Sequence, residues 1–384
     1  MAHDMVLSGY YGFDNLGDEL IGAVLLRALA SHATKDTPLT LTLLRASNPI
    51  ALTHHPMYHA LYRLPHVTVK EANRWHLTQV IGTLLRCRTF LSGGGGLLQD
   101  ATGSGSIVYY GGLCLLAKLL GKQVWMVFQG LGPVQTPWLR WFTGAILRSC
   151  DKILFRDPES MKLASTLAGC KLPMHLVPDS VWGAKALGLL PQWEKVCSTS
   201  NTVLDATKDP SYRLGVSLRE WHTLDDTTLR TLARSILSTA QAQKVSHLHV
   251  VGLSFQACQD MPMLQALEAH LQTYQPTLAP AMALTYTYAQ DTLLKELPTL
   301  HALVAMRFHA LVLGLVCKLP MGILPYAPKL SSLAKRLALE SHVWQPNAIS
   351  PITSTLWQAL PISTQHRIDT LATEATRAFE HLAS

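Results

Sequence analysis

Short apolar runs alternate with helical patterns along almost the whole chain, and this alternation limits the folds open to it. In the first half, strands are predicted at residues 6–8, 39–44, 90–92, 124–128, 152–155 and 175–177, with helices at 20–30, 108–120, 138–148 and 158–168. In the second half, the same alternation starts at residues 214–219 and continues to 321–323. Strands that alternate with helices at this spacing indicate mostly parallel sheets with helices on both faces.

The length and one poorly patterned stretch divide the chain. A length of 384 residues suits two domains of about 100 to 200 residues each. We predict an α/β protein with two Rossmann-like, doubly wound domains facing each other. They are an N-terminal domain at 1–186 and a C-terminal domain at 213–350, joined by a linker at 187–212. A stripe of apolar residues in 351–384 predicts a helical segment that packs back on the body.

Composition narrows the class of protein. Hydrophobic residues are 48% and charged residues 15%, which indicates a globular chain. No basic-then-apolar leader or membrane-length apolar run is present, and the seven cysteines form no CxxC pair. We therefore expect reduced thiols and a cytoplasmic location. The net charge of +7 favours anionic partners. Nucleic acid is not expected, because the basic residues are dispersed and form no binding signature.

The first candidate motif is the strand-to-helix junction at residues 9–19, with the sequence GYYGFDNLGDE. Its glycines allow backbone N–H groups to approach a ligand at the positive end of the next helix. The motif is neither GxGxxG nor a P-loop, which weakens a dinucleotide or nucleotide-hydrolysis interpretation. Asp18 and Glu19 have an alternative role as helix-capping acids. Asp14, at the tip of the turn, is a candidate base for a sugar hydroxyl.

The second motif is a run of four glycines at residues 93–96, expected to follow an apolar strand and to precede Gln99. Glycine costs about 0.5 to 1 kcal/mol relative to alanine in regular structure, so something must require close backbone approach or positive φ. The sequence favours ligand contact over tight packing as that reason.

Cationic side chains follow several predicted strands. Arg156 and Arg219 fall at strand ends, where ligands bind in parallel sheets, although a surface salt bridge would also explain either one alone. Arg307 and His309 stand in an otherwise apolar run, where a buried guanidinium needs an anionic partner. Tyr326 and Lys329 add a hydroxyl and a cation on the loop after the next strand.

These motifs together resemble the polysaccharide pyruvyl transferase family, in detail its CsaB-type branch. The resemblance runs through residues 9–19, FLSGGGGLLQD at 90–100, FQGLGP at 128–133, the Arg156-Asp157 pair, RFHAL at 307–311 and PYAPK at 325–329. Phe308 stands where the family usually has leucine, and Ala327 where a small acidic or polar residue is common.

The resemblance implies a GT-B-like enzyme that transfers pyruvate from phosphoenolpyruvate to a sugar, forms a cyclic ketal and releases phosphate. It implies phosphoenolpyruvate as co-substrate and no other cofactor. No metal is expected, because the histidines are dispersed and show no metal-ligand spacing. The acceptor would be a sugar carried on a lipid diphosphate, which adds an expected contact with the inner face of the plasma membrane.

Roles follow for the individual residues. We assign His309 and Asp14 to catalysis, as proton donor and base. Donor binding is assigned to Arg307, Arg156, Arg219, Lys329 and Phe308. Acceptor binding is assigned to Gly12, Asn15, Gly17, Asp18, Glu19, Gly94, Gly95, Gly96, Gln99 and Tyr326.

Two alternatives remain open from the residues. A GT-B glycosyltransferase that uses a nucleotide sugar would have the same two domains, and nucleotide release would reveal it. A non-catalytic glycan-binding module would bind glycan unchanged by Arg307→Ala and would turn over no donor.

Overall fold

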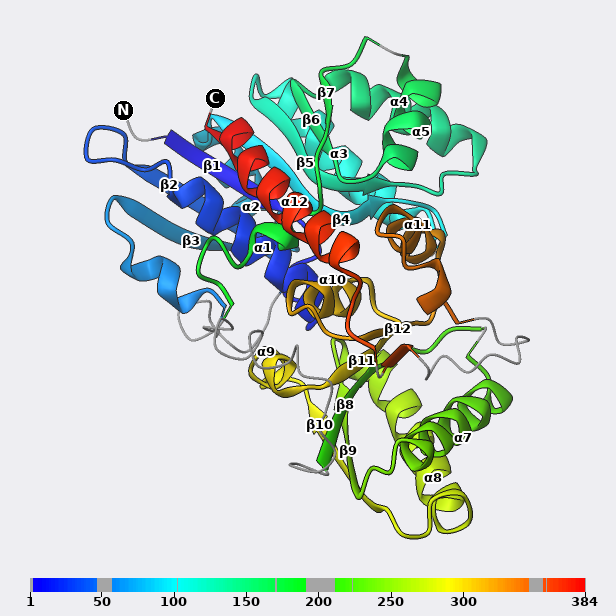
Figure 1. Cartoon of the computed structure of the whole chain (residues 1–384). Coiled ribbons are helices and arrows are strands. Elements are labelled where there is room, and N and C mark those ends of the chain that lie inside the picture. Colours follow the sequence, from blue (N-terminus) through cyan, green and yellow to red (C-terminus); the bar gives the residue numbers. More distant parts are fainter. Residues whose placement is uncertain are drawn as a thin grey trace. The chain divides into compact units, whose positions relative to one another are not determined.

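The chain folds into two compact units in a computed structural model (Figure 1). The model describes residues 3–46, 57–101, 103–169, 171–190, 211–222, 224–344, 355–356 and 358–383. The first unit comprises Met1–Leu189 with Leu371–Ser384, and the second comprises Leu190–Thr370. Most of the predicted linker, residues 191–210, lies outside the described residues.

The first unit is built on a seven-stranded sheet in the order β3-β2-β1-β4-β5-β6-β7, and every neighbouring pair is parallel. The strands are β1 (His3–Ser8), β2 (Leu39–Arg45), β3 (Val67–Asn73), β4 (Thr89–Leu98), β5 (Gln123–Leu131), β6 (Lys152–Phe155) and β7 (Met174–Leu176). The helices are α1 (Leu16–Ala30), α2 (Leu77–Arg86), α3 (Gly105–Leu119), α4 (Pro137–Ser149) and α5 (Pro158–Ala168), with short 3-10 turns η1 (His59–Arg63) and η2 (Ser180–Gly183).

Both faces of this sheet are covered, because successive side chains of a strand point to opposite faces. Val6 of β1 belongs to a core that includes Leu84 of α2 and Leu113 of α3. Its neighbour Leu7 points to the other face, where it and Leu25 of α1 both approach Gly93. A parallel sheet buried on two faces explains the nearly continuous apolar strands of the sequence.

The second unit repeats the pattern with five parallel strands in the order β10-β9-β8-β11-β12. The strands are β8 (Ser211–Ser217), β9 (His247–Leu253), β10 (Ala283–Ala289), β11 (Ala302–Ala305) and β12 (Met321–Ile323). The helices are α7 (Asp226–Ala242), α8 (Ala257–Leu278), α9 (Leu293–Glu296), α10 (Phe308–Val316), α11 (Pro328–Arg336) and the first part of α12 (Ile362–Ala378), with 3-10 turns η3 (Leu297–Thr299) and η4 (Glu340–His342). The rest of α12 and the 3-10 turn η6 (Phe379–Leu382) belong to the first unit. The prediction of two Rossmann-like units is confirmed.

The C-terminal helix α12 begins in the second unit and ends in the first. The apolar stripe seen in the sequence is buried, and its members are Ile368, Leu371, Ala375, Phe379 and Leu382. Within the first unit, the ring of Phe379 lies 5.5 Å from that of Phe128 and packs against the backbone of Gly183.

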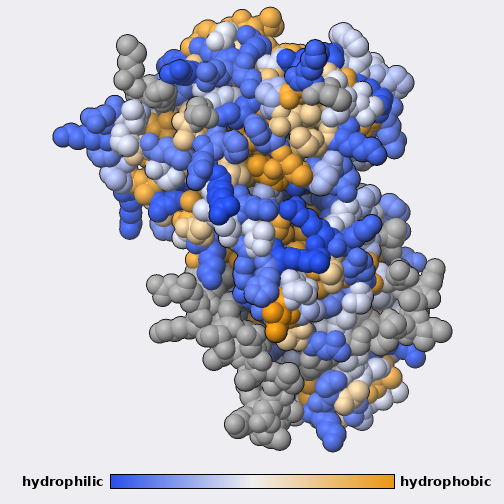
Figure 2. All heavy atoms as spheres, turned by 45° about the horizontal axis from the view of Figure 1, so that its top comes forward, coloured by the Kyte–Doolittle hydropathy of each residue, from blue (hydrophilic) through white to orange (hydrophobic). Residues whose placement is uncertain are grey.

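In the part of the chain that the structure describes, no helix is both long and apolar enough to cross a membrane, and the five cysteines found there are free thiols. Figure 2 shows hydrophobic side chains at the surface in patches among hydrophilic ones. Large exposed examples in the first unit are Leu119, Trp75 and Trp141.

Two features of the first unit differ from the sequence-based expectation. Strand β3 and helix α2 were not predicted, because β3 is an edge strand with charged outward positions and α2 is short and interrupted by Gly82. The glycine run lies inside β4 and does not follow it. The pairing of β4 with β5 shifts register between Gly95 and Leu98, so the strand continues through a bulge.

Tight packing accounts for part of the glycine run. A Cβ at Gly94, whose φ is +66°, would lie 2.0 Å from Cγ2 of Ile21 in α1. A Cβ at Gly93 would lie 2.4 Å from Cδ1 of Leu7. A Cβ at Gly96 would meet nothing within 4 Å. The packing explanation therefore holds for Gly93 and Gly94, while ligand contact at Gly96 stays a prediction.

We expect Gly94→Ala to lower the free energy of unfolding by about 2 kcal/mol or more, because the new methyl overlaps Ile21 and the backbone has positive φ. Gly96→Ala is the matched control and should change stability by less than about 1 kcal/mol. Urea unfolding midpoints of the two variants measure the difference. Equal midpoints would contradict the packing explanation.

Candidate functional site

The carboxyl ends of the strands bring the predicted site residues together in each unit. In both sheets the strand order reverses beside the first strand, at β1/β4 and at β8/β11. Connections leave such a point in opposite directions and open a crevice where ligands bind. The junction at residues 9–19 follows β1, while Arg219 and Arg307 follow β8 and β11.

The loop after β1 is held by its own side chains. Glu19 is buried, and its Oε1 accepts a hydrogen bond from the Gly12 amide at 2.5 Å. Its Oε2 accepts from the Tyr58 hydroxyl at 2.8 Å, and burial raises the pKa of Glu19. Asn15 caps α1 by accepting from the Gly17 amide at 3.1 Å. These N–H groups are engaged within the loop, which gives Glu19, Asn15, Gly12 and Gly17 a part in shaping it.

The loop presents its two remaining acids differently. Asp14 is exposed at the turn with φ of +53°, the left-handed conformation that aspartate adopts more readily than most residues. Asp18 is half-buried, and its Oδ1 lies 2.9 Å from the point that a Cβ on Gly95 would occupy. The glycine at position 95 thus leaves room for this carboxylate. The structure joins the first motif to the glycine run here, and the Tyr11 hydroxyl adds a bond to the Gly93 carbonyl at 2.8 Å.

Beyond the glycine run, Gln99 directly follows β4 and is half-buried. The next residue, Asp100, accepts hydrogen bonds from the amides of Gln135 and Thr136, both at 2.8 Å. This pair of bonds fixes the end of β4 beside the start of α4.

Arg156 belongs to the first unit and has an ion-pair partner there. Its Nη1 lies 2.8 Å from Oδ2 of Asp179, and both side chains are buried. Asp179 also accepts from the Val181 amide at 3.0 Å, and Asp157 caps α5 by accepting from the Ser160 amide at 2.7 Å. The salt-bridge alternative raised by the sequence therefore describes Arg156 well.

Arg307 lies at the start of α10 and is also buried with a carboxylate. Its Nε donates to Oδ1 of Asp260 at 3.0 Å, and its Nη2 contacts the same oxygen. Arg307 is 7% exposed and Asp260 is 0% exposed. The other oxygen of Asp260 accepts from the amides of Phe255 and Gln256 at 2.8 and 2.9 Å. These bonds satisfy a charge pair that would be costly to bury alone.

A single amide oxygen joins the two arginines of this edge. Oε1 of Gln259 accepts from Nη2 of Arg219 at 2.9 Å and from Nη2 of Arg307 at 3.2 Å. Nε of Arg219 is buried and has no hydrogen-bond partner among the described residues. Because Gln259 is neutral, it holds two guanidinium groups close together without cancelling their charge.

Aromatic rings and a lysine complete the edge. The Arg219 guanidinium carbon lies 5.1 Å from the ring centroid of Trp221 and 4.9 Å from that of Tyr326. Nζ of Lys329 lies 5.3 Å from the Tyr326 ring and 5.6 Å from the Phe308 ring. Burial by itself raises the pKa of Tyr326, but the neighbouring Lys329 and Arg219 outweigh it and the pKa is lowered.

His309 lies in the first turn of α10 and is half-buried. Its ring stands edge-on to that of Phe308, with centroids 5.4 Å apart. The structure thus groups all the predicted residues of the second unit at one sheet edge, namely Arg219, Arg307, Phe308, His309, Tyr326 and Lys329. We call them, with Gln259, Asp260 and Trp221, the cationic edge.

Sequence reasoning missed Gln259, Asp260 and Trp221. Asp260 and Gln259 lie at the start of α8, directly after β9, so the rule that polar residues at strand ends reach the ligand edge could have found them. Trp221 lies two residues beyond Arg219 and could have been found in the same way.

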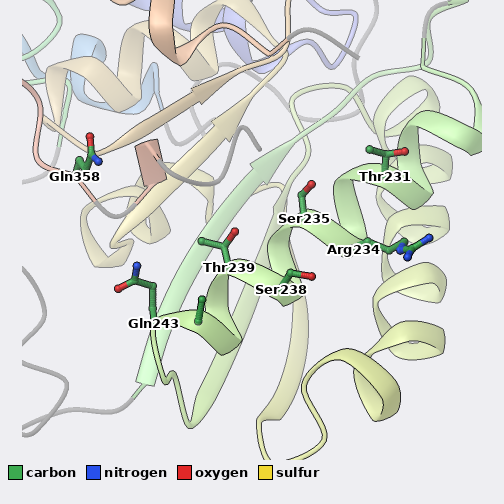
Figure 3. Close-up of a pocket in the computed structure, with 8 residues that line it drawn as sticks. Thr231, Arg234, Ser235, Ser238, Thr239, Gln243 and Gln358 are labelled. Atoms are coloured by element: carbon green, nitrogen blue, oxygen red, sulfur yellow. The ribbon is translucent and has the colours of Figure 1, made fainter. Parts of the chain in front are cut away.

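A separate groove of about 530 Å³ lies along α7 (Figure 3). Its lining is mostly hydroxyl and amide side chains, namely Thr231, Arg234, Ser235, Ser238, Thr239, Ala242, Gln243 and Gln358. Helix α7 runs back from the carboxyl end of β8 to the start of β9, so the later lining residues lie toward the opposite edge of the sheet. The groove is not part of the cationic edge.

Comparison with known proteins adds a family and a fold. Residues 15–244 match the family model described as polysaccharide pyruvyl transferase. No curated protein matches the chain.

Among solved structures, Anabaena HepE in complex with UDP-glucose is similar, with a TM-score of 0.56 at 8% identity over 99% of this chain and 98% of that one. The UDP-GlcNAc 2-epimerase of Methanocaldococcus jannaschii gives 0.56 at 12% identity over 93% and 90%. A putative UDP-N-acetylglucosamine 2-epimerase from Listeria monocytogenes gives 0.55 at 9% identity over 99% and 98%. At these identities the likeness concerns the fold alone, and it agrees with the predicted GT-B-like architecture.

The geometry of Gln259 predicts how the cationic edge binds anions. We expect Gln259→Glu to weaken inorganic phosphate binding at least tenfold, because a carboxylate at this position would, together with Asp260, offset the charges of both arginines. Gln259→Met is the matched control, which removes the same hydrogen bonds and adds no charge. Phosphate-dependent stabilisation in thermal unfolding reports the affinity. An affinity of Gln259→Glu equal to that of Gln259→Met would refute the prediction.

Proposed function

Because this chain belongs to the polysaccharide pyruvyl transferase family, we propose that it transfers pyruvate from phosphoenolpyruvate to a sugar of a cell-envelope or extracellular polysaccharide precursor. The reaction forms a cyclic ketal on the sugar and releases phosphate. The family makes the chain a transferase that acts on a sugar or polysaccharide acceptor. The donor, the lipid-linked acceptor and contact with the inner face of the plasma membrane are our proposals.

The observation that carries the proposed donor is the pair of arginines held by Gln259. Phosphoenolpyruvate has a phosphate and a carboxylate, and guanidinium groups bind both in a bidentate manner. The guanidinium groups of Arg219 and Arg307 lie together at the same edge of the sheet, where both donate to Gln259. Lys329 adds a third cation there. Asp260 engages only Arg307 among the three, so positive charge remains for a dianion.

In the proposed reaction, His309 donates a proton to the methylene carbon of phosphoenolpyruvate. A sugar hydroxyl attacks the resulting cationic carbon and gives its proton to Asp14 as base. The bond between that carbon and the phosphate oxygen then breaks, and a second hydroxyl attacks and loses its proton, which the leaving phosphate takes up. Arg219, Arg307 and Lys329 stabilise the phosphate charge as it develops.

Within this proposal, Arg219 is the partner arginine of Arg307. Both lie at the same sheet edge and share the oxygen of Gln259. Arg156 was the other candidate for this role, but it is ion-paired with Asp179 within the first unit. The cations of the chain neutralise the leaving group, so we propose no cofactor besides phosphoenolpyruvate as co-substrate.

The first test is phosphate release from phosphoenolpyruvate with a pool of lipid-diphosphate disaccharides. We expect acceptor-dependent release by the wild type and a loss in kcat/KM for phosphoenolpyruvate of about 10²-fold in Arg219→Met, since one charge-assisted clamp is removed. Arg219 suits this test because its hydrogen-bond partner is an amide, so no buried carboxylate loses its ion pair.

Arg213→Met is the control for that assay, because Arg213 lies on β8, the strand that Arg219 follows, and pairs with Glu296 at 2.7 Å in a partly exposed position. Its kcat/KM should match that of the wild type. Nucleotide release from a nucleotide sugar, without phosphate release from phosphoenolpyruvate, would favour the glycosyltransferase alternative.

His309→Ala should lower kcat by about 10² to 10⁴, because a positioned proton donor contributes that much to a rate. Phosphate-dependent thermal stabilisation should persist in this variant, which separates proton transfer from donor binding. Initial rates across pH 5 to 9 measure the effect. Near-normal turnover with an unchanged pH profile would remove His309 from the mechanism.

A further inference from the structure

Aromatic side chains surround one buried arginine in the first unit. The guanidinium carbon of Arg74 lies 4.3 Å from the Tyr109 ring centroid, 4.9 Å from Tyr110, 5.0 Å from Phe13 and 5.2 Å from Trp75. Arg74 directly follows β3, so this aromatic cluster lies at the same edge of the sheet as the loop after β1. The proposed mechanism does not use it.

Arg74 has no carboxylate partner within ion-pair distance in the described part of the chain. It is 5% exposed, and its Nη1 donates to the Gly9 carbonyl at 3.0 Å. The Tyr110 hydroxyl donates to the same carbonyl at 3.1 Å, and that of Tyr109 donates to the Arg74 carbonyl at 3.3 Å. Ring faces and the Gly9 carbonyl oxygen therefore stabilise the guanidinium charge, and the guanidinium in turn holds the rings in place.

The rings around Arg74 form an aromatic surface that is partly exposed to solvent. The Trp75 side chain is 62% exposed, although its ring packs edge-on to Phe13 at 6.4 Å and contacts Tyr109 at 5.9 Å. Tyr10 stacks on Phe13 with centroids 4.3 Å apart and extends the surface. Exposing a tryptophan from an otherwise well-packed cluster loses burial that the fold could have gained, which is typical of a binding surface.

The charges beside the cluster select the ligand. Asp14, next to Phe13 in the loop, is exposed, and Asp18 lies on the same loop against Gly95. A phosphate or an anionic lipid surface would be repelled by these carboxylates. Among the described residues, the cation that lies over these rings is Arg74, and it is buried. A pyranose suits both features, because its C–H face packs on an aromatic ring while its hydroxyls donate to carboxylates.

We propose that the Arg74-centred aromatic cluster binds a pyranose ring of the acceptor, with the sugar packed on Trp75 and a hydroxyl edge turned to Asp14. The identity of this sugar as the acceptor rests on the proposed function. The binding of a sugar ring does not, so the two can be tested apart.

The test measures glycan binding without any donor. The probes are soluble disaccharides of glucose, galactose, mannose and their N-acetylated amino forms, free of lipid and diphosphate, titrated by calorimetry. Trp75→Ala should raise the Kd of the disaccharide that binds best by about tenfold, and Trp75→Phe should retain most of the affinity. Trp141→Ala is the matched control, because Trp141 is another well-exposed tryptophan of the same unit that lies on α4, outside the cluster.

Each outcome decides between the two proposals. The proposed sugar binding by the Arg74-centred aromatic cluster would be overturned if Trp75→Ala bound the disaccharide with the same Kd as the wild type. It would also be overturned if the wild type bound no disaccharide, whatever the turnover assay shows. Loss of binding to anionic phospholipid vesicles in Trp75→Ala, with glycan binding intact, would assign the cluster to a membrane surface instead. Trp75-dependent glycan binding without phosphate release from phosphoenolpyruvate would support sugar binding by the aromatic cluster and would refute phosphoenolpyruvate as the donor. In the active enzyme, Trp75→Ala should raise the acceptor KM while the KM for phosphoenolpyruvate stays unchanged.

Discussion

The reversal of strand order beside the first strand is the constraint on which both halves of this protein depend. With right-handed crossovers, the strands on either side of this point send their connections to opposite faces of the sheet. The carboxyl ends between them are left uncovered, and loops from β1 and β4, or from β8 and β11, lie next to each other there. Residues 80 or more positions apart, such as Arg219 and Arg307, become neighbours for this reason alone.

Three buried arginines at these edges show three ways to stabilise a guanidinium. Arg156 is paired with the buried carboxylate of Asp179, which leaves little net charge. Arg307 is paired with Asp260, but its Nη2 also reaches Gln259 and, through it, Arg219. Arg74 is surrounded by ring faces and a carbonyl. The partner, more than the arginine itself, decides whether charge remains available to a ligand.

The two units and the positions of the motifs could be predicted from the sequence, because strand ends and helix starts are set by local sequence patterns. The predicted β6 and α5 spans agree with the structure to the residue. Gln259 and Asp260 were missed because their contact with Arg307 spans 47 positions or more and exists only in the folded sheet. The tight packing at Gly93 and Gly94 could not be predicted for a similar reason, since the side chains that crowd them, Leu7 and Ile21, come from other elements.

The two ligand edges differ in polarity, and this difference argues for a division of labour. The cationic edge combines Arg219, Arg307 and Lys329 with one carboxylate, that of Asp260. This excess of positive charge attracts a small dianion. The first-unit edge combines aromatic rings with Asp14 and Asp18, which would repel the same dianion but accept hydrogen bonds from hydroxyls. An anionic donor and the uncharged sugar ring of the acceptor would therefore bind to different units because of their charge alone.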